Sequence, residues 1–298
     1  MQRSLLSCSR VLARSTTTHA RIAITVNRHI LSYSTAPTSS STNTPPKPST
    51  KRSDRDAFSS SVGTGGLKRF WKNVTVDELP EGFVIKLDGR TLKTPDSKLV
   101  LIPKHRKALA YLVAAEWESQ DRVLKAHALP LTSILTRAID SLSDAEIKKG
   151  VLDQLLRYIH TDTICYHQAE PETIVQLQNE NWVPIIQWLK QEYGIELKTT
   201  DGIMAFKQDA SVIQALEKVI ADLDLIELAA FEKAVMATKS FVIGLALLKR
   251  RLSVQEAETA ARLEVLHQIS RWGEVEDAHD VDREDLKRQL GSVAVVNL

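Results

Sequence analysis

Hydrophobic and polar residues alternate from Phe70 to about residue 102, with the two-residue period of half-buried strands. The pattern predicts four short strands, over residues 71–76, 83–87, 90–93 and 99–102. A turn over 79–82 joins the first two, and Asp88-Gly89 closes a tight hairpin onto the third, because both residues tolerate positive backbone angles. So few strands need cover from helices, and we expect a small antiparallel sheet.

From Pro103 onward the apolar positions recur every three to four residues, which is the period of amphipathic helices. Helices are expected over residues 103–120, 131–142, 143–159, 171–194, 211–223, 224–249, 253–272 and 282–290. Capping boxes over 143–146 and 253–256 mark two of the starts, and Gly194 marks an end. Pro184 predicts a kink within its helix.

These patterns predict an α+β protein. A small N-terminal antiparallel β domain, over 67–102, is expected to precede a larger multihelical domain, over 103–298.

Charge is distributed unevenly along the chain, although its formal net charge is only +2. Residues 1–53 hold eight basic residues and no acidic one, which leaves 31 of the 39 basic residues against 37 acidic residues from Asp54 onward. The folded part is therefore acidic, near minus six. This balance argues against general binding to nucleic acid or to anionic lipid.

The first 35 residues are rich in Arg, Ser and Thr, and arginines recur at Arg14, Arg21 and Arg28 among apolar residues. This is typical of a mitochondrial presequence, whereas a secretory signal would have one unbroken apolar core. Residues 36–66 are rich in Pro, Ser and Gly and predict a disordered linker. We therefore expect the protein to act in the mitochondrial matrix.

Residues 231–248 form the most apolar stretch, but charged residues divide it and leave only nine uncharged positions in a row. Because about twenty are needed to cross a bilayer, we expect a buried central helix and no stable membrane insertion. Cys8 lies in the presequence, so Cys165 has no partner for an internal disulfide. A packed small hydrophobe is favoured over a catalytic thiol at this position.

The densest group of ionisable side chains lies between Trp272 and a predicted helix start at Asp282. Gly273 is expected to end the preceding helix in a left-handed cap, and Asp282 to cap the next. A solvated charged turn accounts for the pattern. A metal or acid/base site is disfavoured, because the loop lacks the calcium-loop glycine and a second histidine at ligand spacing. The acidic and imidazole side chains of this segment are Glu274, Glu276, Asp277, His279, Asp280 and Asp282.

Elsewhere the chain carries no phosphate-binding loop, no nucleophile elbow and no cysteine or histidine pair at metal spacing. Thr161-Asp162-Thr163 is interpreted as a helix stop and turn, and the alternative, an Asp162 carboxylate that accepts hydrogen bonds from backbone amides, is less favoured. Glu116 is interpreted as a helix-surface charge. No catalytic residue, metal site or cofactor is predicted.

Several short segments, in this order, resemble one family: the mitochondrial assembly chaperones that attend the alpha subunit of the ATP synthase catalytic head, the ATP synthase mitochondrial assembly factor 2 family. The match extends over residues 69–292. Its segments are Arg69-Phe70-Trp71-Lys72, Leu87-Asp88-Gly89-Arg90 with Lys93-Thr94-Pro95, Ala115-Glu116-Trp117, Thr161-Asp162-Thr163 with Cys165-Tyr166, Glu227-Leu228-Ala229-Ala230, and Trp272-Gly273-Glu274-Val275-Glu276-Asp277 with His279-Asp280-Val281-Asp282.

The resemblance implies a chaperone without catalysis, which holds unassembled alpha subunit and prevents its aggregation until beta subunit replaces it. We expect the protein to be a monomer. Within the last motif, Glu274 and Glu276 are the leading candidates for functionally sensitive positions. Trp272, Asp277, His279 and Asp280 accompany them. Apolar residues of the β domain are further candidates for contact with the client, and the alternation leaves open which of them face the helices. They include Phe70, Trp71 and Phe83.

Two roles for the acidic motif remain open. Glu274 and Glu276 pair with basic groups of the client, or they pair internally, with Arg271 or Arg262, and hold the last helix in place. At the level of function, an assembly chaperone stands against a matrix enzyme that uses the Glu274–Asp282 cluster, and against a permanent subunit of the finished complex.

Overall fold

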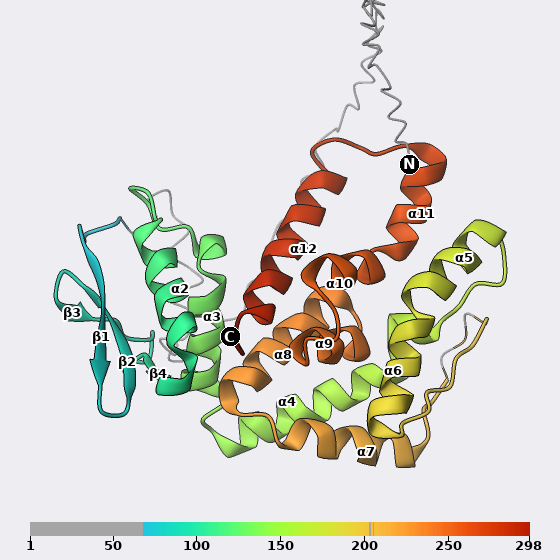
Figure 1. Ribbon diagram of the computed structural model, residues 1–298, viewed down its shortest axis with the longest axis horizontal. Coiled ribbons are helices and arrows are strands. Elements are labelled where there is room, and N and C mark those ends of the chain that lie inside the picture. Colours follow the sequence, from blue (N-terminus) through green and yellow to red (C-terminus); the bar gives the residue numbers. More distant parts are fainter. Residues whose placement is uncertain (1–67, 203, 205) are drawn as a thin grey trace, which may run out of the picture. The chain divides into compact units, whose positions relative to one another are not determined.

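The computed structural model describes residues 68–298 except 203 and 205 (Figure 1). The presequence expected over 1–35, the whole linker expected over 36–66 and the first residue of the predicted β domain lie outside the described residues.

An antiparallel sheet is followed by helices, so the predicted α+β class is confirmed. The strands are β1 (Val74–Leu79), β2 (Gly82–Leu87), β3 (Arg90–Thr91) and β4 (Leu101–Pro103). The α-helices are α2 (Lys107–Glu118), α3 (Pro130–Thr136), α4 (Ala145–Tyr158), α5 (Glu172–Asn181), α6 (Val183–Tyr193), α7 (Ala210–Ala221), α8 (Leu225–Thr238), α9 (Phe241–Leu248), α10 (Val254–Ala261), α11 (Leu263–Trp272) and α12 (His279–Ala294).

Strand β2 lies at the centre of the sheet. It pairs with β1 on one edge and with β3 and β4 on the other, and α2 packs against β1, β2 and β4. Asp88 and Gly89 both have positive φ angles, 47° and 80°, which confirms the predicted hairpin turn. Gly82 is required for close packing, because a Cβ atom there would lie 2.2 Å from the carbonyl oxygen of Ile102.

The segment 69–72 ties the sheet to α2. The Arg69 guanidinium donates to the carbonyl oxygens of Glu118 and Gln120, at 2.8 and 2.6 Å, where α2 ends. The carboxylate of Asp88 accepts the backbone N–H groups of Asn73 and Lys72, each at 2.9 Å, and these bonds lower the pKa of Asp88. Because the amides of Lys72 and Asn73 donate to the Asp88 carboxylate, β1 begins only at Val74. The strand start expected at Trp71 is wrong.

Glu116 stabilises the N-terminus of α3, so its interpretation as a helix-surface charge is wrong. Its carboxylate accepts the backbone N–H groups of Leu131 and Thr132, at 2.6 and 2.9 Å, and the Thr132 hydroxyl at 2.9 Å. Burial raises the pKa of Glu116. The neighbouring Trp117 donates from its indole nitrogen to the same hydroxyl, at 3.0 Å. Two helices are therefore joined by one side chain acting as a cap.

We expect Glu116→Ala to lower the free energy of unfolding by about 2 kcal/mol, since two buried backbone donors lose their acceptor. Glu116→Gln keeps one acceptor oxygen and should lose about half of that amount. Urea denaturation of both variants measures the difference. Glu217→Ala is the control, because Glu217 is exposed on α7 and its side chain makes no hydrogen bond or ion pair among the described residues. An equal loss in the control would contradict the capping role.

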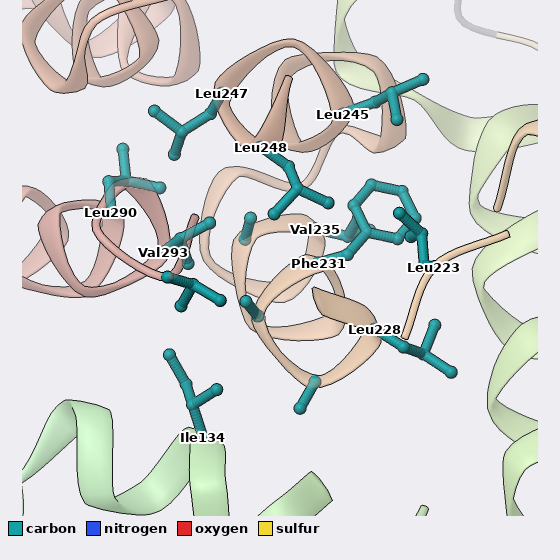
Figure 2. Packing of buried hydrophobic residues seen from close by; sticks show 14 of the residues in the cluster. Ile134, Leu223, Leu228, Phe231, Val235, Leu245, Leu247, Leu248, Leu290 and Val293 are labelled. Carbon is teal, nitrogen blue, oxygen red and sulfur yellow. The ribbon is translucent and has the colours of Figure 1, made fainter. Parts of the chain in front are cut away.

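The apolar core centres on α8 and α9, which correspond to the predicted 224–249 helix (Figures 1 and 2). The helix is divided at Lys239, whose φ is 58°, and the Ser240 hydroxyl caps α9 by accepting the N–H of Ile243. Phe231 and Phe241 meet edge to face, with ring centroids 4.9 Å apart. Figure 2 shows Leu290 and Val293 of α12 and Ile134 of α3 near this pair of helices. All eight residues of α9 are buried.

The predicted capping boxes, the kink at Pro184 and the helix end at Gly194 agree with the structure except at two places. The Ser253 capping box is confirmed, but α4 is capped by Asp144 and not by Ser143. The kink expected at Pro184 is a complete break, because α5 ends before Trp182 and Pro184 lies in the first turn of α6. Gly194 ends α6 in the left-handed conformation, as predicted. Among the described residues, no helix is long and apolar enough to cross a membrane.

Candidate functional site

The acidic motif forms the connection between α11 and α12 (Figure 1). Gly273 has φ 87° and ψ 161°, so it ends α11 with a positive φ but without the predicted left-handed cap. Helix α12 begins at His279, and the start expected at Asp282 is wrong. The reason is a closed turn: Val275 donates its N–H to His279 Nδ1 at 3.1 Å, and the N–H of His279 donates back to the carbonyl of Val275 at 3.0 Å.

Arg262 fixes the first turn of α12 to the body of the protein. Its guanidinium is buried with the carboxylate of Glu258, 2.9 Å away, and donates to the carbonyl oxygen of His279 at 2.9 Å. Asp282 approaches the same guanidinium at 3.4 Å. Of the internal pairings expected for this motif, Arg262 therefore contacts Asp282 and not Glu274 or Glu276.

The two leading glutamates differ in their surroundings. Glu274 pairs with Arg283 of α12, with 3.2 Å between Oε1 and Nη1. Glu276 and Asp277 are exposed, and within residues 68–298, apart from 203 and 205, neither side chain makes a hydrogen bond or an ion pair. Asp280 lies half-buried, with one carboxylate oxygen that has no protein partner among the described residues. Glu276 and Asp277 are the carboxylates available to another molecule.

Exposed apolar side chains accompany these carboxylates. Trp272 is 74% exposed, with the Arg271 guanidinium 5.4 Å from its ring centroid, and Val275 and Val281 are each 59% exposed. We call residues 271–284 the acidic tip. It contains six acidic residues and two arginines. Apolar contact area edged by negative charge is suited to binding a protein surface.

The chemistry available at the acidic tip is limited. His279 uses Nδ1 as an acceptor for a backbone amide, which assigns the ring a structural role. Throughout the described part of the chain, no group of three or more His, Cys, Asp or Glu side chains is arranged to hold a metal ion. Cys165 is buried elsewhere, and burial raises the pKa of its thiol, which confirms its interpretation as a packed residue.

The three aromatic candidates of the β domain are separated by the structure. Phe70 is 68% exposed, but Trp71 and Phe83 are only 3% and 4% exposed, so these two are wrong as client contacts. Phe83 packs in the core, and the Trp71 ring faces Trp117 of α2 with centroids 5.1 Å apart. Phe70 rests edge-on against Trp71, at 5.0 Å. Of these three, only Phe70 presents its ring to another molecule.

Comparisons with known proteins point to one family. Residues 68–190 match the family described as ATP12 chaperone protein. The mitochondrial protein atp12 of Schizosaccharomyces pombe is 38% identical over 248 residues, covering 80% of this chain and 85% of that protein. The mitochondrial protein ATP12 of Saccharomyces cerevisiae is 33% identical over 269 residues, covering 76% and 83%. The crystal structure of Atp12 from Paracoccus denitrificans superposes with a TM-score of 0.68 at 30% identity, covering 78% of this chain and 98% of that one.

Proposed function

The chain belongs to the ATP12 chaperone family, and from that membership we propose that it holds the unassembled alpha subunit of mitochondrial ATP synthase in the matrix until beta subunit replaces it. Both yeast relatives are named mitochondrial proteins, which supports a mitochondrial location. A subunit awaiting assembly exposes an apolar interface that promotes aggregation, and a chaperone must cover it reversibly.

The observation that carries the proposal is the acidic tip. Trp272 and the two exposed valines offer apolar area, while Glu276 and Asp277 have no partner among the described residues. Apolar contact supplies affinity for an exposed interface, and unpaired carboxylates add specificity for a client with basic groups. Ion pairs between these exposed carboxylates and basic groups of the client would be weak, and a better partner could displace them easily.

Suppression of aggregation tests the proposal. Purified alpha subunit is diluted from denaturant with and without an equimolar amount of the chain, and light scattering is followed. We expect wild type to suppress scattering and Glu276→Lys to need about tenfold more protein, because charge reversal repels a basic client. Glu217→Lys, which reverses an exposed charge on α7, is the matched control and should act as wild type.

Two outcomes would contradict the proposal. If wild-type protein leaves the scattering of the alpha subunit unchanged, the chain does not hold this client. If Glu276→Lys and Glu217→Lys suppress scattering equally well, the acidic tip has no part in holding the alpha subunit. Glu274→Gln tests the internal pairing separately: it breaks only the exposed pair with Arg283, so we expect a change in unfolding free energy of less than about 1 kcal/mol.

A further inference from the structure

Helix α11 carries more apolar surface than the body of the protein covers. Leu263 and His267, one turn apart, are buried. Val265, Ile269 and Trp272 form a second row at the spacing i, i+4, i+7, which places them on one side of the helix. Val265 and Ile269 are half-buried, Trp272 is exposed, and none of the three belongs to the apolar residues that pack against the core in the described part of the chain. We call this row the α11 stripe.

The neighbouring helix does not cover the α11 stripe. Consecutive antiparallel helices normally bury their apolar rows against each other. Here α11 and α12 each pack on α10, and α11 packs on α5, but within the described residues α11 and α12 make no extensive contact with one another. Figure 1 shows both helices leading away from α10 to the connection that contains the acidic tip. The stripe is therefore left uncovered by α12, partly exposed at Val265 and Ile269 and exposed at Trp272, where it reaches the acidic tip.

The shape and charge of this surface specify its partner. The α11 stripe extends over two helical turns, about 10 Å, which matches two turns of another helix. An extended peptide has nothing to pair with, because the backbone groups of α11 are hydrogen-bonded within the helix. Six acidic residues against two arginines in the acidic tip favour lysine or arginine on the partner.

We propose that the α11 stripe binds an amphipathic helix of the client, whose apolar face covers Val265, Ile269 and Trp272 and whose basic residues meet Glu276 and Asp277. This inference rests on the proposed function and specifies the element of the client that is held. An apolar row lying in contact with a partner helix, with charged groups at its end, is the usual arrangement for a helix bound to a helical surface.

A designed peptide tests the inference without the client. A peptide of leucine and lysine, of roughly 18 residues and patterned as an amphipathic helix, is labelled and titrated with the full chain by fluorescence anisotropy. A peptide of the same composition in scrambled order, and a leucine and glutamate peptide with the same pattern, are controls. We expect the helical basic peptide to bind at least about tenfold more tightly than either. Trp272 emission should shift to shorter wavelength, and this shift should be absent in Trp272→Phe.

Two variants separate the α11 stripe from its helix. Ile269→Ser removes an apolar contact. Gln268→Ser, at the adjacent exposed position, introduces the same residue and costs at least as much helix propensity without removing an apolar side chain. Ile269→Ser should weaken peptide binding about tenfold and Gln268→Ser should leave it unchanged, with circular dichroism showing both folded. Equal affinity of the two variants, or equal binding of the scrambled or acidic peptide, overturns the inference. So does a dimer in sedimentation velocity that dissociates in Ile269→Ser, because the stripe would then bind a second copy.

The peptide and aggregation experiments fail in different ways. If wild-type protein suppresses aggregation of the alpha subunit but does not bind the basic peptide, the proposed function stands and the α11 stripe is not the docking site. If the peptide binds and aggregation is unaffected, the stripe stands as a surface for basic helices and the alpha subunit is the wrong client.

Discussion

Asp162→Ala is expected to lower the free energy of unfolding by roughly 3 kcal/mol, because at least two buried backbone donors lose their acceptor. Asp162 is fully buried before a short 3₁₀ turn, Thr163–Cys165. Its carboxylate accepts the N–H of Ile164 at 3.2 Å and the N–H of Val242, in the first turn of α9, at 3.0 Å. One side chain therefore closes the turn and caps the central helix.

The same carboxylate predicts a pH dependence. Burial raises the pKa of Asp162 from 3.8 to about 6, although the surrounding hydrogen-bond donors oppose the change. Between these values the folded state binds more protons than the unfolded state, so the contribution of Asp162 to stability falls as pH rises from about 4 to 6. Asp162→Asn remains neutral throughout, and wild type should lose stability relative to this variant across that interval.

Guanidinium denaturation of wild type, Asp162→Asn and Asp162→Ala at a series of pH values measures both effects. Asp144→Ala, which removes an exposed cap from α4, is the control for general loss of a helix cap and should cost about 1 kcal/mol. An Asp162→Ala variant no less stable than this control would contradict the role of the buried carboxylate. A constant difference between wild type and Asp162→Asn over pH 4 to 6 would contradict the raised pKa.

Features set by neighbouring residues were predictable from the sequence. The Asp88-Gly89 hairpin, the Ser253 cap and the Gly194 helix end each depend on backbone geometry within a few positions. Contacts between distant residues were not. Glu116 caps a helix by accepting a backbone N–H 15 residues later in the chain, and Arg69 donates to a carbonyl 51 residues away. Nothing in a local pattern distinguishes such side chains from exposed charges, because their roles exist only after the helices have packed.

In the acidic tip, too, the local feature was predictable from the sequence and the contact between distant residues was not. Charge density identified the segment, but the pairing of Glu274 with Arg283 depends on where α12 begins. The sequence suggested a start at Asp282, whereas the turn closed by His279 begins the helix earlier and brings Arg283 near Glu274. Glu276 has no partner among the described residues, which the charge density of the segment does not indicate.

Arg106→Met is expected to lower the free energy of unfolding by about 2 kcal/mol, because the buried guanidinium donates hydrogen bonds to a carboxylate that is itself 47% exposed and partly solvated. Arg106 lies buried before α2 and donates two hydrogen bonds to Asp224, at 3.1 and 2.6 Å. It also donates to the side-chain oxygen of Asn297 at 3.2 Å. Asp224 caps α8 by accepting the N–H groups of Ile226 and Glu227. The pair thus joins the start of α2, the start of α8 and the C-terminal residues.

A double-mutant cycle with Asp224→Asn isolates this pair, since asparagine retains the cap on α8 but loses the charge. We expect a coupling energy of about 1 to 3 kcal/mol, and additive effects of the two substitutions would contradict the pairing.

Burial acts to raise the pKa of Asp224, but the hydrogen bonds from Arg106 and from the Glu227 N–H outweigh it and lower the pKa. The contribution of the pair is therefore complete above the ordinary pKa of 3.8 and is lost as pH falls through the lowered value. Acid weakens the Arg106 to Asp224 connection, while it favours the buried Asp162 carboxyl between pH 6 and 4. Urea denaturation of Arg106→Met and Asp162→Asn over one pH series should consequently show two changes over separate pH intervals. The stability lost in Arg106→Met should shrink as pH falls below 3.8, and wild type should lose stability relative to Asp162→Asn as pH rises from about 4 to 6.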